Sequence, residues 1–505
     1  MPQNGFHPNV QQQHIVAAVA ARHPVVIVNA FAGTGKTSVL EFIAQTIRRP
    51  AAYLVFNRKN ADEARKRLPA WVQVGTAHSW AYRAPHPDNN RPMVEFYPRL
   101  LPTYHLVRQC FGQENISQET MVAITATLRS YCQSQDARVG EQHVPAAVHH
   151  MSQTNRYHPP EWYVMYAQAV FDHLRRTPGE TSHDIYLKLY SLQSPALKGD
   201  LLFIDEAQDL NPCMLNIIEK QIQCGKQVVL VGDRYQHIYG FNGAIDAMAV
   251  ISAKYQGTEL PLTGSYRFGE NIAAVANQIL ARMGCSHQIH GLARQPGVIR
   301  DMADAPAPGQ AVIYRKNISM LHDLLRLPPD LPVQVVGGVQ ELSQMLQSAF
   351  ALYKGERTDH PEIGMFRSWE ELVTFAESDA GRHLWPVVSY IEEQHGIHTA
   401  LAVLTRIEKN NQPHALPENT LILTTAHKSK GLEFNAVQLS SDMEDSLETD
   451  NVFILPPRSR EAMLAEMALL YVAATRARVT LNLGGIGQRL RGLEQFPCRL
   501  LSLER

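Results

Sequence analysis

The residues best placed for chemistry form a stretch of small side chains behind an apolar run. AFAGTGKT at positions 30–37 follows the β-branched run VVIV at 25–28, and a segment with helical spacing comes next. Small residues let backbone N–H groups wrap around phosphates, and a helix N-terminus adds positive potential. We expect Lys36 to reach the β- and γ-phosphates of ATP and the Thr37 hydroxyl to bind Mg²⁺. The first position, Ala30, departs from the strict glycine pattern.

A second chemical feature is a pair of carboxylates at the end of another apolar run. Asp205 and Glu206 follow Leu202-Phe203-Ile204. Asp205 can hold the metal ion together with Thr37, and Glu206 is placed to orient an attacking water. The plain alternative is an exposed acidic turn after a strand. With the phosphate loop upstream, we predict a site for nucleotide hydrolysis.

Parallel sheets are needed to bring these residues together. Apolar runs at 25–28, 51–56, 201–204 and 227–231 alternate with helical segments, a pattern typical of an α/β fold. A second series contains runs at 311–314, 333–336, 421–424 and 436–439. The 505 residues also exceed the roughly 250–300 that one core supports.

The expected organisation is two parallel-sheet domains, each with a helical insertion. The first domain comprises 1–82 and 200–259, and its insertion comprises 83–199. The second domain comprises 260–354 and 418–505, and its smaller insertion comprises 355–417.

Composition places limits on partners and compartment. The net charge of -1 gives no global attraction for nucleic acid, so any such binding needs a local basic groove. None of the six cysteines forms a C-x-x-C pair, which argues against a zinc ribbon and favours reduced thiols. The polar start of the chain and the lack of an apolar run of about 18 residues predict a cytoplasmic protein without a membrane anchor.

Further motifs follow the carboxylates in a fixed order. The stretch DEAQD at 205–209 resembles the corresponding motif of superfamily 1 helicases of the UvrD/Rep/PcrA group. The other matching stretches are FNRK at 56–59, GTAHS at 75–79, GDRYQHIYGFNGA at 232–244, SYR at 265–267, TAHKSKGLEF at 425–434 and YVAATRA at 471–477. Within the group, TSHDIYLKL at 181–189 is most similar to the F-box DNA helicases and their bacterial or phage relatives. Because the nucleotide motifs start almost at residue 1, we expect no F-box.

The resemblance implies two RecA-like domains of the P-loop NTPase class, with ATP between them. Gln12, or its neighbour Gln13, would read the adenine, and Tyr266 would stack on it. Gln236 would sense the γ-phosphate, and Glu433 would contact the ribose. Arg267 and Arg476 would reach the γ-phosphate across the cleft, where an arginine can raise the rate by roughly 10³–10⁵. The phosphate loop would contribute Ala32, Gly33, Thr34, Gly35, Lys36, Thr37 and Ser38.

The resemblance also implies a track for DNA. Tyr239 and Phe241 would stack with bases, an interaction worth roughly 1–3 kcal/mol per base and tolerant of any sequence. Phe241 could instead fill a gap in the core, and His78 and His427 could be structural. The backbone track would consist of Asn57, Arg58, Thr76, His78, His427 and Lys430.

We therefore expect an ATP-dependent translocase or DNA helicase, moving 3′ to 5′ and serving DNA repair or recombination. Its partner would be single-stranded DNA or a junction of single- and double-stranded DNA, with a nuclease or recombination factor as a further partner. The small insertion at 355–417 favours translocation or protein stripping over processive unwinding. An ATP-gated DNA-sensing switch subunit, working with a nuclease in phage defence for example, is the alternative.

Overall fold

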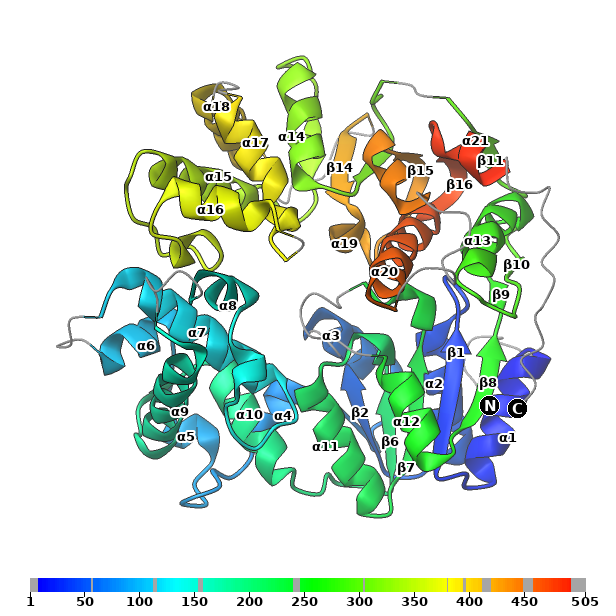
Figure 1. Cartoon of the computed structure of the whole chain (residues 1–505). Coiled ribbons are helices and arrows are strands. Elements are labelled where there is room, and N and C mark those ends of the chain that lie inside the picture. Colours follow the sequence, from blue (N-terminus) through cyan, green and yellow to red (C-terminus); the bar gives the residue numbers. More distant parts are fainter. Residues whose placement is uncertain are drawn as a thin grey trace.

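Two parallel sheets of six strands each form the frame of the molecule (Figure 1). The computed structural model describes residues 8–55, 58–111, 116–152, 158–238, 246–302, 305–378, 380–393, 397–410, 419–447 and 457–491. The first sheet has the order β3-β2-β6-β7-β1-β8, and all its pairs are parallel. Its strands are β1 (Val25–Ala30), β2 (Ala51–Val55), β3 (Val72–Thr76), β6 (Leu201–Ile204), β7 (Gln227–Gly232) and β8 (Thr258–Leu262).

The order of the central strands explains how chemical groups from distant parts of the sequence meet. β6, β7 and β1 are parallel neighbours, so their carboxyl ends share one edge of the sheet. Ligands of open α/β sheets bind outside this edge. The small-residue loop after β1, the carboxylates after β6 and Asp233 after β7 therefore lie together. Helices α1 (Val10–Ala20), α2 (Lys36–Ile47), α3 (Arg58–Arg67), α11 (Pro212–Gln223) and α12 (Ala247–Tyr255) accompany this sheet.

The second sheet has the order β11-β16-β15-β12-β14-β13, again with parallel pairs. Its strands are β11 (Val298–Arg300), β12 (Ala311–Tyr314), β13 (Val333–Val335), β14 (Leu421–Thr425), β15 (Phe434–Leu439) and β16 (Ala477–Asn482). The neighbouring helices are α13 (Glu270–Arg282), α19 (Ala426–Ser429), α20 (Pro457–Ala474) and α21 (Ile486–Arg491). α20 packs against α13 and α19, and it also contacts the 3₁₀ turn Arg234–Gln236 of the first domain.

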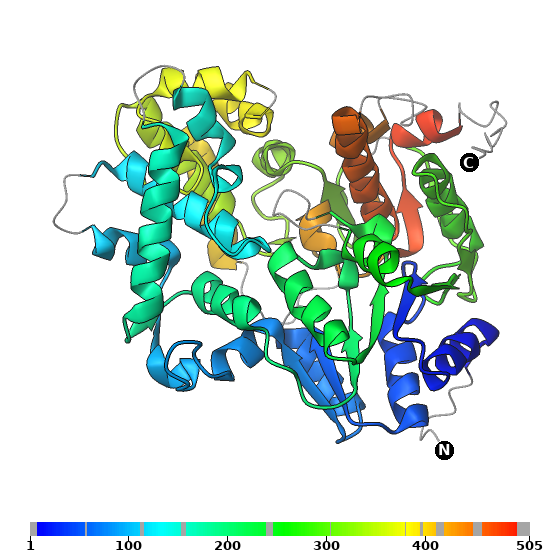
Figure 2. The same cartoon turned by 60° about the horizontal axis from the view of Figure 1, so that its bottom comes forward.

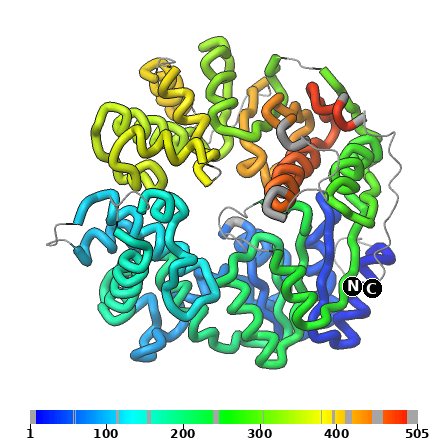
Figure 3. The backbone as a smooth tube through the Cα atoms, in the orientation of Figure 1, coloured from blue at the N-terminus to red at the C-terminus, as the bar shows by residue number. Residues whose placement is uncertain are grey.

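Two groups of helices extend from the sheets, and they lie side by side in Figures 1, 2 and 3. The first group lies between β3 and β6: α4 (Ala77–Arg83), α5 (Met93–Phe96), α6 (Thr103–Cys110), α7 (Gln118–Gln133), α8 (Ala146–Ser152), α9 (Pro160–Arg176) and α10 (His183–Gln193). The second contains α14 (Asn317–Arg326), α15 (Gln340–Tyr353), α16 (Trp369–Ala376), α17 (Trp385–Glu392) and α18 (Ile397–Asn410). Short paired strands also occur: β4 (Arg99–Leu100) with β5 (Glu180–Thr181), and β9 (Gly264–Ser265) with β10 (His290–Gly291).

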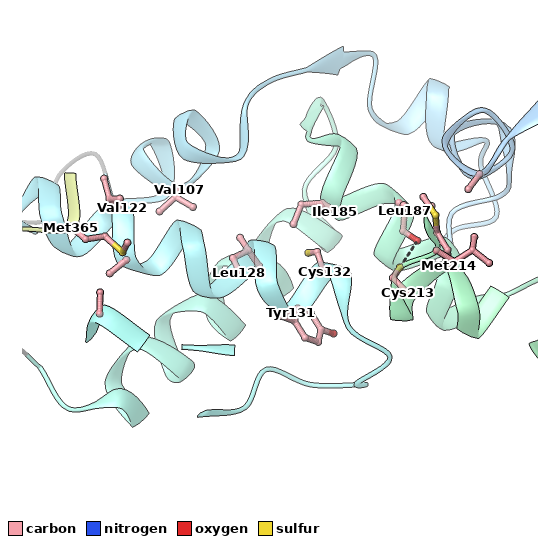
Figure 4. Packing of buried hydrophobic residues seen from close by; sticks show 14 of the residues in the cluster. Val107, Val122, Leu128, Tyr131, Cys132, Ile185, Leu187, Cys213, Met214 and Met365 are labelled. Atoms are coloured by element: carbon pink, nitrogen blue, oxygen red, sulfur yellow. Dashed lines mark hydrogen bonds between the residues drawn. The ribbon is translucent and has the colours of Figure 1, made fainter. Parts of the chain in front are cut away.

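The two helical groups contact each other through both apolar and charged residues. Met365 lies beside Val122 of α7 in the same buried cluster (Figure 4). The nearly buried carboxylate of Glu119 pairs with Arg367 at 3.0 Å and with Arg357 at 3.9 Å. The molecule is thus connected twice, once between the sheets and once between the helical groups.

The expected α/β fold with two parallel sheets and helical insertions is confirmed. Two expected boundaries differ in detail. β8 pairs with β1, so residues 260–262 belong to the first sheet rather than to the second domain. α15 packs on α17 and α18, and α14 contacts α18, so the second helical group includes residues before 355. Within the described residues, no helix has both the length and the apolar character needed to cross a bilayer.

Candidate active site

The loop between β1 and α2 has the backbone shape of a phosphate cradle. Gly33 and Gly35 have φ values of 73° and 82°, in the left-handed region that favours glycine. Ala30 ends the extended strand β1, so the absent first glycine has no conformational cost. The Lys36 ammonium lies against the loop and donates to the carbonyls of Ala30 and Phe31, at 3.0 and 3.2 Å.

The remaining loop residues hold the cradle in place through their side chains. The Thr34 hydroxyl donates to the Phe31 carbonyl at 2.8 Å. The Ser38 hydroxyl accepts from Arg67 at 3.4 Å. Ala32 is buried, and its N–H donates to a hydroxyl from the second domain.

Thr37 and Asp205 meet as the sequence predicts for a shared metal site. The Thr37 hydroxyl donates to Oδ2 of Asp205 at 3.0 Å, and the Tyr53 hydroxyl donates to the same atom at 2.8 Å. Burial and the neighbouring Glu206 raise the pKa of Asp205 to about 6. Sequence analysis missed Tyr53 because it resembles any aromatic in a buried strand. The parallel register that sets Tyr53 beside Phe203 brings its hydroxyl to the site.

Glu206 keeps its charge despite its surroundings. Burial acts to raise its pKa, but the nearby cations of Lys36 and Lys430, together with a hydrogen bond from Gln208, outweigh it and lower the pKa. The Gln208 amide donates to Glu206 at 2.6 Å. A charged, oriented carboxylate beside Lys36 suits the expected role of positioning water.

Two arginines from outside the first sheet approach this site, one just before β16 of the second sheet and one just after β9. Arg476 precedes β16 and is only 1% exposed, and it donates to the Val472 and Leu432 carbonyls and to the Thr475 hydroxyl. Within the described residues it has no carboxylate partner at ion-pair distance. Burial and the adjacent Arg267 lower its pKa to about 9.

Arg267 lies beside Arg476 and makes different contacts. It donates to the Thr475 carbonyl and to Glu433, both at 2.9 Å. Glu433, expected at the ribose, is thus an ion-pair partner of Arg267. A Cβ added to Gly33 would lie 2.6 Å from Cβ of Arg267, so the phosphate loop and this arginine are in direct contact.

The residues expected to bind the adenine can also be located in the structure. Tyr266 donates its backbone N–H to the Gly33 carbonyl at 2.9 Å, and the residue is 52% exposed. Gln12 is buried, and its amide oxygen accepts from the Asn9 N–H, whereas its Nε2 is a buried donor without a partner among the described residues. Gln13 is exposed and donates to Pro8. A buried unpaired amide donor suits an adenine ring nitrogen, which favours Gln12 over Gln13.

Two family profiles match parts of this chain. A profile described as "AAA domain" matches residues 12–242, and one described as "UvrD-like helicase C-terminal domain" matches residues 381–485. These stretches contain the phosphate loop and the Arg476 segment respectively. Together these matches support a UvrD-like superfamily 1 helicase.

Several relatives of this helicase family align over most of the chain. F-box DNA helicase protein 1 of Schizosaccharomyces pombe is 28% identical over 518 residues, covering 96% of the chain and 58% of the relative. F-box DNA helicase 1 of Gallus gallus is 27% identical, covering 93% of the chain and 48% of the relative. ATP-dependent DNA helicase UvrD2 of Mycobacterium tuberculosis is 25% identical over 357 residues, covering 59% of the chain and 49% of the relative. The chain therefore spans about half the length of these relatives.

The structure describes some of the residues that were expected to contact DNA. Arg58 is exposed at the start of α3. Thr76 caps α4, where its hydroxyl accepts the Ser79 N–H at 3.1 Å. The ring of His78 packs against those of His183 and Tyr186, and burial lowers its pKa. Asn57, Tyr239 and Phe241 lie outside the described residues.

His427 and Lys430, both expected on the backbone track, make contacts between the two domains. Lys430 forms an ion pair with Asp209 at 2.6 Å, in which the side chains are 9% and 5% exposed, and it also donates to the Gln236 carbonyl. His427 donates through Nε2 to the Ile238 carbonyl at 3.2 Å, and burial and Arg315 lower its pKa to about 4. Both side chains thus bridge the two domains rather than line an exposed groove.

Proposed function

We propose that this chain is an ATP-driven motor on single-stranded DNA. The observation that carries the proposal is the convergence of a phosphate loop and a carboxylate pair from the first sheet with Arg476, just before β16 of the second sheet, and Arg267, just after β9. ATP bound between the domains would be held from both sides. Its hydrolysis would then depend on domain approach, which is the condition for coupling chemistry to movement.

The residues present fit MgATP. Lys36 and the loop N–H groups would hold the phosphates, and Thr37 and Asp205 would hold Mg²⁺. When bound, Mg²⁺ would neutralise charge on the β- and γ-phosphates. Glu206 would orient the attacking water. Arg267 and Arg476 would stabilise charge on the transferring phosphoryl group, and Gln236 would respond to its presence.

The nature of the track is proposed from the relatives, whose printed names call them DNA helicases. Arg58 follows β2, and Thr76 ends β3 just before α4. Both lie at the carboxyl edge of the first sheet, where they would contact the DNA backbone. Tyr239 and Phe241 would stack with bases. A 3′ to 5′ direction and a role in repair or recombination are proposed from the same resemblance. The protein would then work in the cytoplasm, on nucleoid DNA or with a nuclease or recombination partner.

Translocation is proposed as the primary activity because the second helical group is small. The test is ATP-driven displacement of streptavidin from oligonucleotides biotinylated at either the 3′ or the 5′ end. Faster clearance of the 5′ end supports 3′ to 5′ movement. Equal, ATP-independent release from both ends would contradict a motor and leave the switch role as the better proposal.

A further inference from the structure

One phenol crosses from the second domain into the nucleotide site. Tyr471 lies on α20 and is completely buried. Its hydroxyl accepts the N–H of Ala32 in the phosphate loop at 3.2 Å and donates to Oδ2 of Asp233 at 3.0 Å. This oxygen atom therefore touches two separate strand ends of the first sheet at once.

Asp233 transmits this contact to the residue expected to sense the γ-phosphate. Its Oδ2 also accepts from Nε2 of Gln236 at 2.8 Å, and its Oδ1 accepts the Tyr235 N–H at 3.1 Å. The Asp233 N–H donates to the Gln208 amide oxygen at 3.0 Å. Both oxygens and the N–H of Asp233 are thus engaged, so the carboxylate has one defined orientation.

The protonation of the pair fixes the direction of each hydrogen bond. Burial and the nearby carboxylate raise the pKa of Tyr471 well above its ordinary value, so the hydroxyl keeps its proton. Because its lone pair accepts the Ala32 N–H, that proton is directed to Asp233. The carboxylate in turn can bond only the NH₂ end of Gln236. The second amide proton and the amide oxygen of Gln236 take no part in the bond with Asp233.

The surroundings make this arrangement conditional on domain docking. Phe31 and Ala32 of the phosphate loop are buried in a hydrophobic cluster formed mainly by α13 and α20 of the second domain. Tyr471 is the member of this cluster whose polar atom reaches the site. Moving α20 away would remove the hydroxyl from both of its partners together.

We propose that Tyr471 is a positioning residue for ATP hydrolysis, which orients Gln236 through Asp233 only when the second domain is docked. The inference rests on the proposed function, since it assigns a role within the same reaction. Tyr471 touches no reacting atom in this arrangement. It makes the competence of the γ-phosphate sensor depend on the position of the other domain.

The test uses Tyr471→Phe, which removes the hydroxyl and keeps the ring. Losing a buried hydrogen bond that matters during turnover should lower kcat for DNA-stimulated ATP hydrolysis about ten-fold. KM for ATP should stay within about three-fold, because Lys36 and the other loop groups that bind phosphate are retained. In a Gln236→Ala background the same substitution should change kcat by less than about two-fold, because both act through one link.

Tyr314→Phe is the matched control. Tyr314 is another fully buried tyrosine of the second domain, and its hydroxyl donates to Asp323 at 2.8 Å. It should retain wild-type kcat at a similar melting temperature to Tyr471→Phe. Should Tyr471→Phe melt well below it, Asp233→Asn tests the same link from the first domain.

The outcomes separate this inference from the proposed function. If wild-type protein and Lys36→Ala hydrolyse ATP equally, the proposed function fails. If Lys36→Ala is inactive but Tyr471→Phe keeps kcat within about two-fold of wild type, the positioning role alone is wrong. A ten-fold loss that persists in the Gln236→Ala background would also overturn it, because the hydroxyl would then act independently of the sensor.

Discussion

Two like charges lie together at the centre of the candidate site. Arg267 donates to the Thr475 carbonyl and Arg476 donates to the Thr475 hydroxyl, so their guanidinium groups are neighbours. Glu433 neutralises Arg267, whereas the buried Arg476 relies on neutral oxygens. An anionic phosphate would relieve this concentration of positive charge, which gives a physical reason for the two domains to close on ATP.

A substitution at Lys430 tests whether this lysine binds DNA or stabilises the contact between the two domains. Lys430→Met leaves the Asp209 carboxylate buried without its cation, which typically costs about 3–5 kcal/mol when a buried pair is broken. We therefore expect a clearly lower melting temperature in the absence of DNA, and partial recovery in Lys430→Met combined with Asp209→Leu. Weakened DNA binding with unchanged melting would instead support the original track assignment.

His427 predicts a pH dependence of the domain contact. Its pKa is about 4 in the folded protein against an ordinary value of 6.5, so between these values the unfolded chain binds a proton that the folded chain does not. Stability is therefore present above pH about 6.5 and is lost as the pH falls through this window. Lowering the pH from 7 to 5 should reduce the melting temperature of wild type by about 2–4 °C more than that of His427→Gln. Equal losses would mean that this imidazole does not control the contact.

At the scale of elements, a strand end and a helix start set the phosphate cradle. β1 is extended through Ala30, and the two glycines with positive φ then turn the chain into α2. The sequence predicted this cradle because strand, turn and helix are all local features. It also predicted Asp205 and Glu206, because an apolar run precedes them, whereas Arg476 was expected from the resemblance of its motif to the helicase group.

Local sequence patterns could not predict the contacts between separate helices and strands. Tyr53 and Tyr471 look like ordinary core aromatics in the sequence, and their hydroxyls acquire roles only through strand register and domain packing. The contacts that Lys430 and His427 make between the domains were not predicted for the same reason. Their partners Asp209 and Ile238 are more than 180 residues away along the chain, and no local pattern specifies that approach.

A substitution at Gly33 tests the close contact between the phosphate loop and the Arg267 segment. In Gly33→Ala the new methyl group meets a φ of 73° and atoms of Arg267 and Ser265 at 2.6 Å. ATP turnover should fall at least about ten-fold because the loop and the Arg267 segment must separate. Gly225→Ala is the control, since Gly225 has a φ of 80° but nothing within 4 Å of the added atom. It should lose only about 1–2 kcal/mol of stability and retain activity. Equal ATPase losses in both variants would show that backbone strain alone, and not the contact with Arg267, is responsible.

At the scale of the whole molecule, two separate connections hold the four parts together (Figure 1). One joins the sheets through Tyr471, Lys430 and His427, and the other joins the helical groups through Glu119 and its arginines. Closure around ATP would change the first connection directly. Both connections combine polar or charged contacts with buried apolar residues.

The most direct measurement is the steady-state ATPase rate of the purified chain, with and without single-stranded DNA, beside Lys36→Ala. A DNA-driven motor predicts a rate that rises sharply with DNA, a DNA response that weakens with added salt, and no activity in Lys36→Ala. A wild-type rate that ignores DNA, or one that survives in Lys36→Ala, would contradict the proposed motor.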